Sequence, residues 1–281
     1  MYSLKNKGKQ FLLKKSFQAR FENFLSSDLF NVQPEHSKTE YWQHHSEKIK
    51  YSIKKNILTV EGDSGNYIPD RKNSLDFFVK SIKTSVKKLI STNNSNKLSY
   101  QKAFDKIMVE KRTPDFQQVN INEKKILANS FSDCKKIYPF DYEINDKIIN
   151  AYYIIIILSS YIDLPRTKFI TEIGAGNGNL ISLFKSHFKT QCIIDIDLPE
   201  TLILCIPFLN NLFPDAKILL PNEIGDNINK NSLLEHDFIF LTPNQINLLE
   251  ENLIDLFINT HSFGEMNMVQ IAEYFKLIQR V

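Results

Sequence analysis

A cluster of glycines is the clearest chemical signal in the sequence. Three of the chain's eight glycines, Gly174, Gly176 and Gly178, lie in the stretch TEIGAGNGN, closely behind Glu172. Glycine adopts backbone conformations that other residues avoid, and it lets a ligand approach the main chain closely. An apolar run, KFITEIG, leads into the cluster, and a helical pattern follows it. We therefore predict a tight turn from a strand into a helix whose first N–H groups can bind a ligand.

The spacing of these glycines separates two classes of nucleotide ligand. The dinucleotide fingerprint GxGxxG needs a glycine at the position where this chain has Asn179. The observed pattern, E-x-G-x-G-x-G from Glu172 to Gly178, resembles motif I of class I S-adenosylmethionine (SAM)-dependent methyltransferases. The chemistry agrees with this resemblance, because a carboxylate attracts the ammonium group of SAM but repels a pyrophosphate. SAM is therefore the predicted cofactor.

A second acid lies where a ribose-binding carboxylate is expected. Asp197 ends the apolar run QCIIDID, roughly 20 residues beyond the glycines, the spacing typical of nucleotide sites in parallel sheets. Asp195 is the alternative, since strand alternation turns its side chain to the same face, one pair of residues deeper. We favour Asp197 because ligands bind at the carboxyl ends of parallel strands. The segment DLPE, which begins at Asp197 and continues with Leu198, resembles the DLP segment of many small-molecule O-methyltransferases.

Polar residues crowd the end of a later apolar run. The segment INTHSFGEM follows NLIDLF and contains Asn259, His261, Ser262 and Glu265. Together with the glycine motif, DLPE and FPDAKILLP, it resembles a bacterial family of sugar O-methyltransferases, over residues 137–281. The resemblance implies transfer of a methyl group from SAM to a sugar hydroxyl of a glycan or glycoconjugate, as in polysaccharide modification. It also implies that the residues after this strand face the transferred methyl group.

The resemblance and the residue types together indicate the site residues. A sugar hydroxyl is a poor nucleophile near neutral pH, so a base that takes its proton is useful. His261 is the first candidate, and Glu265 is the second, as base or as the group that orients His261. Both have structural alternatives: His261 as a helix cap, and Glu265 with Ser262 as an S-x-x-E capping box for the last helix. The predicted cofactor-binding residues are Glu172, Gly174, Ala175, Gly176, Gly178, Asp197, Leu198 and Asn259.

The spacing of the apolar runs predicts the strands and helices that position these residues. Strands are predicted at residues 168–174 and 191–197, at either or both of 216–221 and 236–243, and at 253–259, with helical patterns among them. This alternation is typical of an α/β fold with a parallel sheet, and the resemblance implies the Rossmann-like sheet of class I methyltransferases. Such a sheet normally has seven strands, so we expect one that lacks its C-terminal strands. Either the chain is truncated, or a partner such as a second copy completes the sheet.

The first half of the chain contains no motif that we recognise. Residues 1–135 are predicted to form a mainly helical region, a lid or an acceptor-recognition domain, and residues 136–281 the SAM-binding domain. Residues 1–20 include six basic and no acidic residues. We interpret them as the start of an amphipathic helix, and the spacing of residues 75–90 predicts another. The buried side of the first helix is predicted to contain Phe11, Leu12, Phe17, Phe21 and Phe24.

Composition limits the class of protein, the partners and the compartment that we expect for this chain. Hydrophobic residues make up 42% of the chain and the net charge is only +3, so we expect a folded core and no nucleic-acid partner. Three cysteines without a CxxC pair, and no signal peptide, favour a reduced cytoplasmic protein. The most apolar segment, AYYIIIILSSYIDL, is too short to span a membrane. Adjacent His44 and His45 point apart, so no metal site is expected.

Two other functions fit parts of the pattern. An NAD- or nucleotide-sugar-binding protein would use the same kind of turn, although Asn179 at the third glycine position disfavours it. A truncated or degenerate methyltransferase fold, which binds SAM or a partner without catalysis, is the non-enzymatic alternative. The missing strands favour this second alternative.

Overall fold

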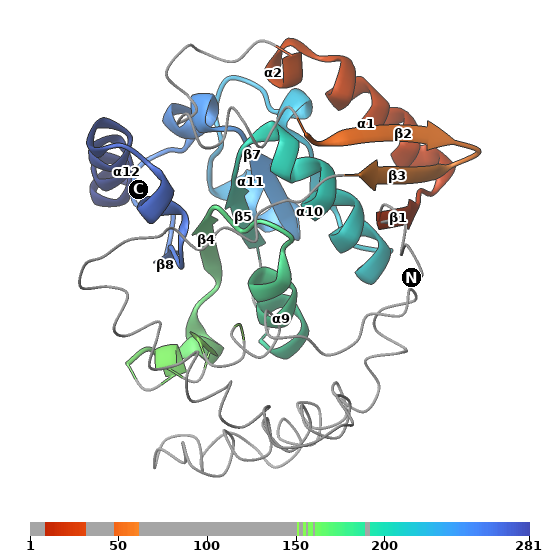
Figure 1. Cartoon of the computed structure of the whole chain (residues 1–281). Coiled ribbons are helices and arrows are strands. Elements are labelled where there is room, and N and C mark those ends of the chain that lie inside the picture. Colours follow the sequence, from red (N-terminus) through yellow and green to blue (C-terminus); the bar gives the residue numbers. More distant parts are fainter. Residues whose placement is uncertain are drawn as a thin grey trace, which may run out of the picture. The chain divides into compact units, whose positions relative to one another are not determined.

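The chain divides into two units, of which the first contains the predicted site. Met1–Gly65 and Pro165–Val281 form the first unit, and Asn66–Leu164 forms the second. The computed structural model describes residues 9–31, 48–61, 151, 154–155, 157–159, 161–188 and 192–281. The predicted helix at residues 75–90 and the predicted boundary after residue 135 lie outside these ranges. Apart from a 3₁₀ turn, η2 (Leu164–Arg166), all elements named below belong to the first unit (Figure 1).

A five-stranded parallel sheet organises this unit. Its strands lie in the order β6-β7-β5-β4-β8, and every adjacent pair is parallel. The predicted α/β class is confirmed, and both alternatives for the third predicted strand form strands. Among the described residues, β6 and β8 are the two edges of the sheet. The strands are β4 (Phe169–Ile173), β5 (Cys192–Ile196), β6 (Ile218–Leu219), β7 (Phe238–Leu241) and β8 (Leu256–Ile258).

Helices cover both faces of this sheet. Every residue of β4, β5 and β7 is buried, as expected for parallel strands that are covered on both sides. On one face, Ile194 belongs to a core cluster that includes Tyr274 of α12. On the other, Lys185 of α9 and Phe213 at the end of α10 meet the ring of Phe238, at 5.8 and 5.5 Å from its centroid. The helices are α9 (Asn179–His187), α10 (Pro199–Leu212), α11 (Lys230–Glu235) and α12 (Met268–Arg280), with the 3₁₀ turns η3 (Pro221–Glu223), η4 (Pro243–Leu248) and η5 (Ser262–Glu265).

The last helix has a different cap from the one that the sequence suggested. The Asn267 side chain accepts hydrogen bonds from the backbone N–H groups of Val269 and Gln270, both at 3.0 Å. The Gln270 side chain accepts in return from the Asn267 N–H at 2.9 Å, which completes a capping box. The structural alternative in which Ser262 and Glu265 cap this helix is therefore wrong. These two residues begin and end the separate turn η5.

The N-terminal segment forms a small antiparallel sheet and two helices. Its strand order is β1-β3-β2, and a turn at Lys55 and Asn56, with φ of +49° and +60°, joins β2 to β3. The described part of the region predicted to be mainly helical therefore contains a sheet that the sequence pattern did not indicate. The elements are β1 (Lys9–Leu12), α1 (Lys15–Ser26), α2 (Asp28–Asn31), β2 (Lys50–Lys54) and β3 (Ile57–Glu61).

The buried face predicted for the first helix is correct except at its start. Phe17, Phe21 and Phe24 are buried on α1, as predicted. Phe11 is also buried, but it belongs to strand β1, and Leu12 beside it is 52% exposed. The prediction for Leu12 is wrong because successive residues of a strand point to opposite faces, whereas a helix would have placed both on one side.

Helix α1 is attached to the large sheet beside its edge strand β6. The Arg20 guanidinium donates two hydrogen bonds of 2.5 Å to the Glu223 carboxylate and one of 2.6 Å to the carbonyl of Ile218 in β6. A side chain that binds an edge-strand carbonyl hinders pairing of that strand with another chain. Elements β1 and α2 contact α10 on the same side of the unit (Figure 1), and α10 is buried over most of its length.

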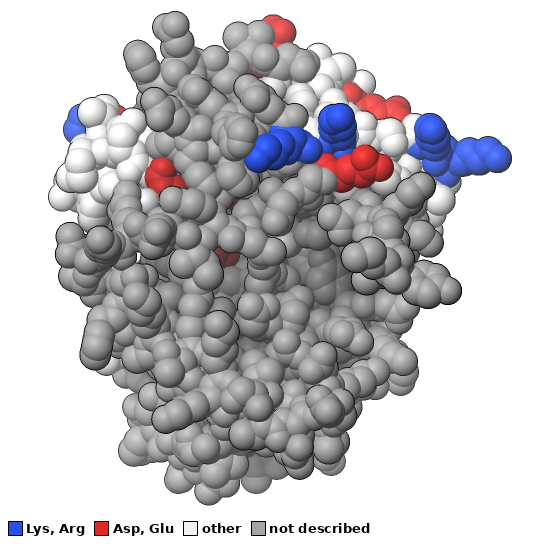
Figure 2. All heavy atoms as spheres, in the orientation of Figure 1, with Lys and Arg blue, Asp and Glu red and all other residues white. Residues whose placement is uncertain are grey.

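Charged side chains of both signs occur on the described surface. On the face shown in Figure 2, blue and red side chains of the described residues are interspersed. Among the residues described, no helix combines the length and the apolarity that crossing a membrane requires.

Candidate functional site

The glycine cluster forms the predicted turn between a strand and a helix. Strand β4 ends at Ile173, and α9 begins at Asn179. Gly174, Gly176 and Gly178 all have positive φ, of +78°, +61° and +77°. Residues with a Cβ atom reach this left-handed region only at a cost of about 1–2 kcal/mol, so the turn needs glycine at each of the three positions.

The surroundings of the three glycines differ. A Cβ atom on Gly174 would lie 2.5 Å from both Cβ and Oγ of Ser262, and one on Gly178 would lie 2.8 Å from Sγ of Cys205. A Cβ atom on Gly176 would meet nothing within 4 Å. The first and third glycines therefore allow close packing within the protein itself. Gly176 alone faces open space, from which a ligand can approach the main chain.

The N–H groups of the turn already donate to carboxylates of the protein. The Gly176 N–H donates to Asp197 Oδ2 at 2.9 Å, and the Ala175 N–H donates to Asp195 Oδ1 at 3.4 Å. The other oxygen of Asp197, Oδ1, accepts from the Leu198 N–H at 2.7 Å. A turn built to hold phosphate points such N–H groups at the ligand. In this protein, Asp195 and Asp197 already accept hydrogen bonds from two of the N–H groups of the turn.

Three carboxyl groups gather next to this turn, and we call them the acid cluster: Glu172, Asp195 and Asp197. Glu172 and Asp195 are register partners on the parallel strands β4 and β5, and Asp197 follows two residues later on the same face. All three are buried, at 2%, 0% and 8% exposure. Within the described part of the chain, Glu172 Oε2 and Asp195 Oδ2 have no hydrogen-bond partner.

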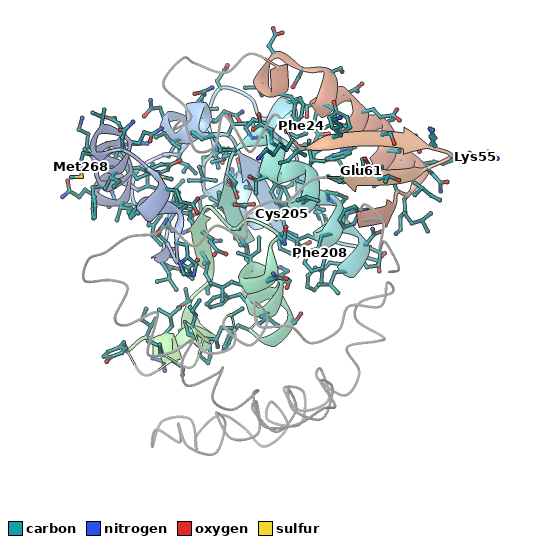
Figure 3. The ribbon with its side chains drawn as sticks, viewed as in Figure 1. Phe24, Lys55, Glu61, Cys205, Phe208 and Met268 are labelled. Atoms are coloured by element: carbon teal, nitrogen blue, oxygen red, sulfur yellow. The ribbon has the colours of Figure 1, made fainter. Side chains whose placement is uncertain are left out.

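Helix α10 closes the cluster from one side. Its residue Cys205 is fully buried, and its thiol lies close enough to Asp195 for that carboxyl group to raise the pKa of the thiol. Figure 3 places Cys205 in the interior, where α10 approaches the strands. The same sulfur atom is the one that Gly178 packs against. The thiol therefore lies between the glycine turn and the acid cluster.

Burial makes full ionisation of the acid cluster unfavourable. It raises the pKa of Glu172, and the negative charges of Asp195 and Asp197 raise this pKa further. Burial and the charge of Asp197 likewise raise the pKa of Asp195. Burial also raises the pKa of Asp197, to about 7, although the N–H groups of Gly176 and Leu198 act in the opposite direction.

The segment after β8 is tied to the end of β4 by a set of contacts that we call the Ile173 clasp. Asn259 Nδ2 donates to the Ile173 carbonyl at 3.0 Å, and Ser262 Oγ donates to the same oxygen at 2.7 Å. Asn259 Nδ2 also donates to Ser262 Oγ, and Asn259 Oδ1 accepts from the Phe263 N–H at 3.3 Å. These bonds place Ser262 directly against Gly174.

The two predicted catalytic residues follow this clasp. His261 is exposed and immediately precedes η5, and its carbonyl accepts from the Gly264 N–H at 2.9 Å. Glu265 is half-buried and close enough to Asp197 for its charge to raise the pKa of Asp197. Both therefore lie at the carboxyl edge of the sheet, on the segment that the clasp holds against the glycine turn. Their catalytic roles stay predictions.

The predicted cofactor-binding residues have three kinds of surroundings. Glu172, Ala175, Gly176 and Asp197 come together at the ends of β4 and β5, as predicted. For Asn259, the side-chain contacts described above all lie within the protein, so its contact with a cofactor stays a prediction. Leu198 is buried at the start of α10.

Sequence reasoning missed the positions of Cys205 and Ser262 at this site. Cys205 lies inside a nearly continuous apolar helix, where nothing local distinguishes it from a core residue. Ser262 was named among the polar residues that follow the last strand, and its specific role was considered only as a helix cap. Among the described residues, no three His, Cys, Asp or Glu side chains are grouped as metal ligands would be.

Comparison with known proteins does not show a family for this chain. No model of a known protein family matches this chain, and no curated protein matches it either. The chemistry of the site and the sequence resemblance are therefore what indicate the function.

Proposed function

We propose that this site binds SAM and that the protein is a SAM-dependent O-methyltransferase that acts on a sugar hydroxyl. One observation carries the proposal: three buried carboxyl groups adjoin a glycine turn whose N–H groups at Ala175 and Gly176 already donate to two of them. Such a site favours a ligand with positive charge and hydroxyl groups.

The same observation argues against an anionic ligand. A pyrophosphate would meet the negative charges of Asp195 and Asp197, and it would find the N–H groups of the turn occupied. SAM carries an ammonium and a sulfonium group, and its ribose hydroxyls are donors that a carboxylate accepts. The charge of the ligand therefore separates SAM from NAD or a nucleotide sugar at this site.

The residues present suit the parts of SAM. Asp197, at the carboxyl end of β5, is the proposed partner of the ribose hydroxyls, and Glu172 and Asp195 provide negative charge for the cationic groups. Gly176 provides the open side of the turn. When bound, SAM supplies a methyl group on a positively charged sulfur, which an oxygen nucleophile can attack.

The acceptor half of the proposal depends on the segment after β8. His261 is the proposed base: its imidazole takes the proton of the sugar hydroxyl as the oxygen attacks. Glu265 is the second candidate, either as the base or as the group that orients His261. The sugar as acceptor is supported by the resemblance of the INTHSFGEM segment to sugar O-methyltransferases.

Isothermal titration calorimetry with SAM and with NAD tests the cofactor. We expect SAM to bind and NAD not to bind, with SAM binding abolished by Asp197→Ala and by Gly176→Arg, which fills the open side of the turn. Asp226→Asn, an exposed acid elsewhere on the unit, is the matched control and should bind SAM normally. Binding of NAD without SAM would overturn the assignment.

Methyl transfer to a panel of sugars tests the reaction. His261→Ala should lower the rate by about 100-fold or more, the usual contribution of a general base, and should leave SAM affinity unchanged. An unchanged rate in this variant would remove His261 from the mechanism. Tight SAM binding without transfer to any acceptor would favour the non-catalytic alternative instead.

A further inference from the structure

The acid cluster also has a consequence for how a ligand binds. We propose that the ligand-free protein keeps a proton between Glu172 and Asp195, and that a cationic ligand expels this proton into solvent when it binds. The inference rests on the proposed function, because it assumes that the ligand is SAM. It adds that SAM binding is coupled to proton release.

The geometry of the pair supports a shared proton. Glu172 and Asp195 are register partners, and adjacent strands lie about 4.8 Å apart, so their side chains project next to each other. Both are almost completely buried, and each has one oxygen atom without a hydrogen-bond partner among the described residues. A proton on either carboxyl group removes the repulsion between two neighbouring buried negative charges.

Among the described residues, no cation is one of the groups that shift the pKa of Glu172 or Asp195. The ionisable groups that interact electrostatically with the pair or with Asp197 are Asp197 itself, directly after β5, Cys205 on α10, Glu265 in η5 and Tyr274 on α12. None of the four carries positive charge in any protonation state. Burial raises the pKa of Glu172, Asp195 and Cys205, as expected where negative charge gathers away from water.

A cationic ligand should favour loss of the proton that the carboxyl pair holds. Its positive charge stabilises the fully ionised cluster, so the proton leaves the carboxyl pair and passes to the buffer. The pair loses one proton and the site gains one positively charged ligand, and no covalent bond other than this O–H bond changes. Because a proton is released, affinity for SAM should rise with pH, by up to about tenfold for each pH unit while the pair titrates.

Calorimetry in two buffers measures the released proton directly. We would titrate the full chain with SAM in phosphate buffer and in imidazole buffer, because the ionisation enthalpies of these two buffers differ. A pH near 6.5 keeps the α-amino group of SAM protonated, since the pKa of such a group is about 8. The apparent binding enthalpy should differ between the buffers by an amount that corresponds to about one proton from the pair, in addition to any proton that Asp197, with its pKa of about 7, releases. Adenosine, which is neutral, is the ligand control and should bind without releasing a proton.

Matched variants assign the proton to the pair. Glu172→Gln keeps the shape of the side chain but cannot ionise, so it should release about one proton fewer than the unmodified protein when it binds SAM. Asp195→Asn should behave in the same way and serves if Glu172→Gln does not fold, as judged by circular dichroism. Asp226→Asn should release as many protons as the unmodified protein.

The outcomes separate this inference from the proposed function. SAM binding with the same enthalpy in both buffers would overturn the proton coupling and leave the proposed function standing. Undiminished proton release in both Glu172→Gln and Asp195→Asn would show that the proton comes from elsewhere, which also overturns the inference. Absence of SAM binding in the unmodified protein would overturn the proposed function itself.

Discussion

Glu172 and Asp195 lie opposite each other on the parallel strands β4 and β5, and together they place two carboxyl groups in the interior of a largely apolar sheet. Apolar residues of similar size would stabilise the fold more at these positions, because buried charges lose their hydration. The pair therefore costs stability, and we attribute this cost to its role in binding a ligand.

The cluster should make stability depend on pH. The pKa values of Glu172 and Asp195 are raised and that of Asp197 is about 7, so above about pH 4 the folded protein holds protons that the unfolded chain has lost. The free energy of unfolding should therefore fall as pH rises from about 5 to 8. Thermal unfolding without ligand measures this trend. Glu172→Gln should reduce the slope, and a melting temperature that rises over this range would contradict the prediction.

The three glycines should respond differently to alanine. Gly176→Ala should cost about 1–2 kcal/mol, because only the positive φ is unfavourable there. Gly174→Ala should cost about 1–3 kcal/mol more, because its Cβ collides with Ser262. Urea denaturation measures both changes. If the collision is the cause, adding Ser262→Gly should recover part of the loss in Gly174→Ala, and it should give no such benefit to Gly176→Ala.

The Ile173 clasp should hold the segment that contains His261. Removing both donors, in Asn259→Ala combined with Ser262→Ala, leaves the Ile173 carbonyl without either side-chain partner and should cost about 1–3 kcal/mol. A double-mutant cycle should reveal coupling between the two residues, because they share one acceptor. Ser186→Ala is the matched control, because that hydroxyl donates to the Ser182 carbonyl one turn earlier in the same helix. Additive single effects would show that the clasp does not act as a unit.

The contact of α1 with the large sheet should depend on the shape of Arg20. Arg20→Gln should lower the free energy of unfolding by about 1–2 kcal/mol, a value that allows for partial exposure of the Arg20 and Glu223 side chains. Arg20→Lys should recover only part of this loss, because lysine cannot form the two parallel bonds to the carboxylate. Lys14→Gln, at an exposed ion pair with Asp215, is the control and should have little effect. Equal stability of all three variants would mean that the Arg20 contact contributes nothing measurable.

Much of the site was predictable because its signals are local. A strand, a glycine turn and a helix are contiguous, so the pattern from Glu172 to Gly178 was sufficient to predict the turn that forms between β4 and α9. The period of side chains along a strand likewise predicted that Asp195 and Asp197 share a face. Parallel strands end at one edge, so it followed that these acids meet the turn.

The N-terminal sheet was not predictable from local pattern. Strand β1 pairs with β3, whose residues lie about 48 positions later, and Arg20 binds a carboxylate 203 positions away. Periodicity reports which face of a segment is buried, but it does not report which distant segment covers that face. Residues 9–12 therefore resembled the start of a helix until the pairing partner was known.

The cap of the last helix likewise could not be predicted from local pattern. Ser262 with Glu265 and Asn267 with Gln270 both match the local signature of a capping box, and only the second pair caps α12. The Ser262 hydroxyl is bound to the Ile173 carbonyl, 89 positions earlier in the chain, and is unavailable to the helix. The sequence alone determined the residue types at the site and their order along the strands. Tertiary structure decided which glycines pack against side chains, which carboxylates take the N–H groups of the turn, and which polar residues hold the edge, because each of these contacts joins segments that are distant in the chain.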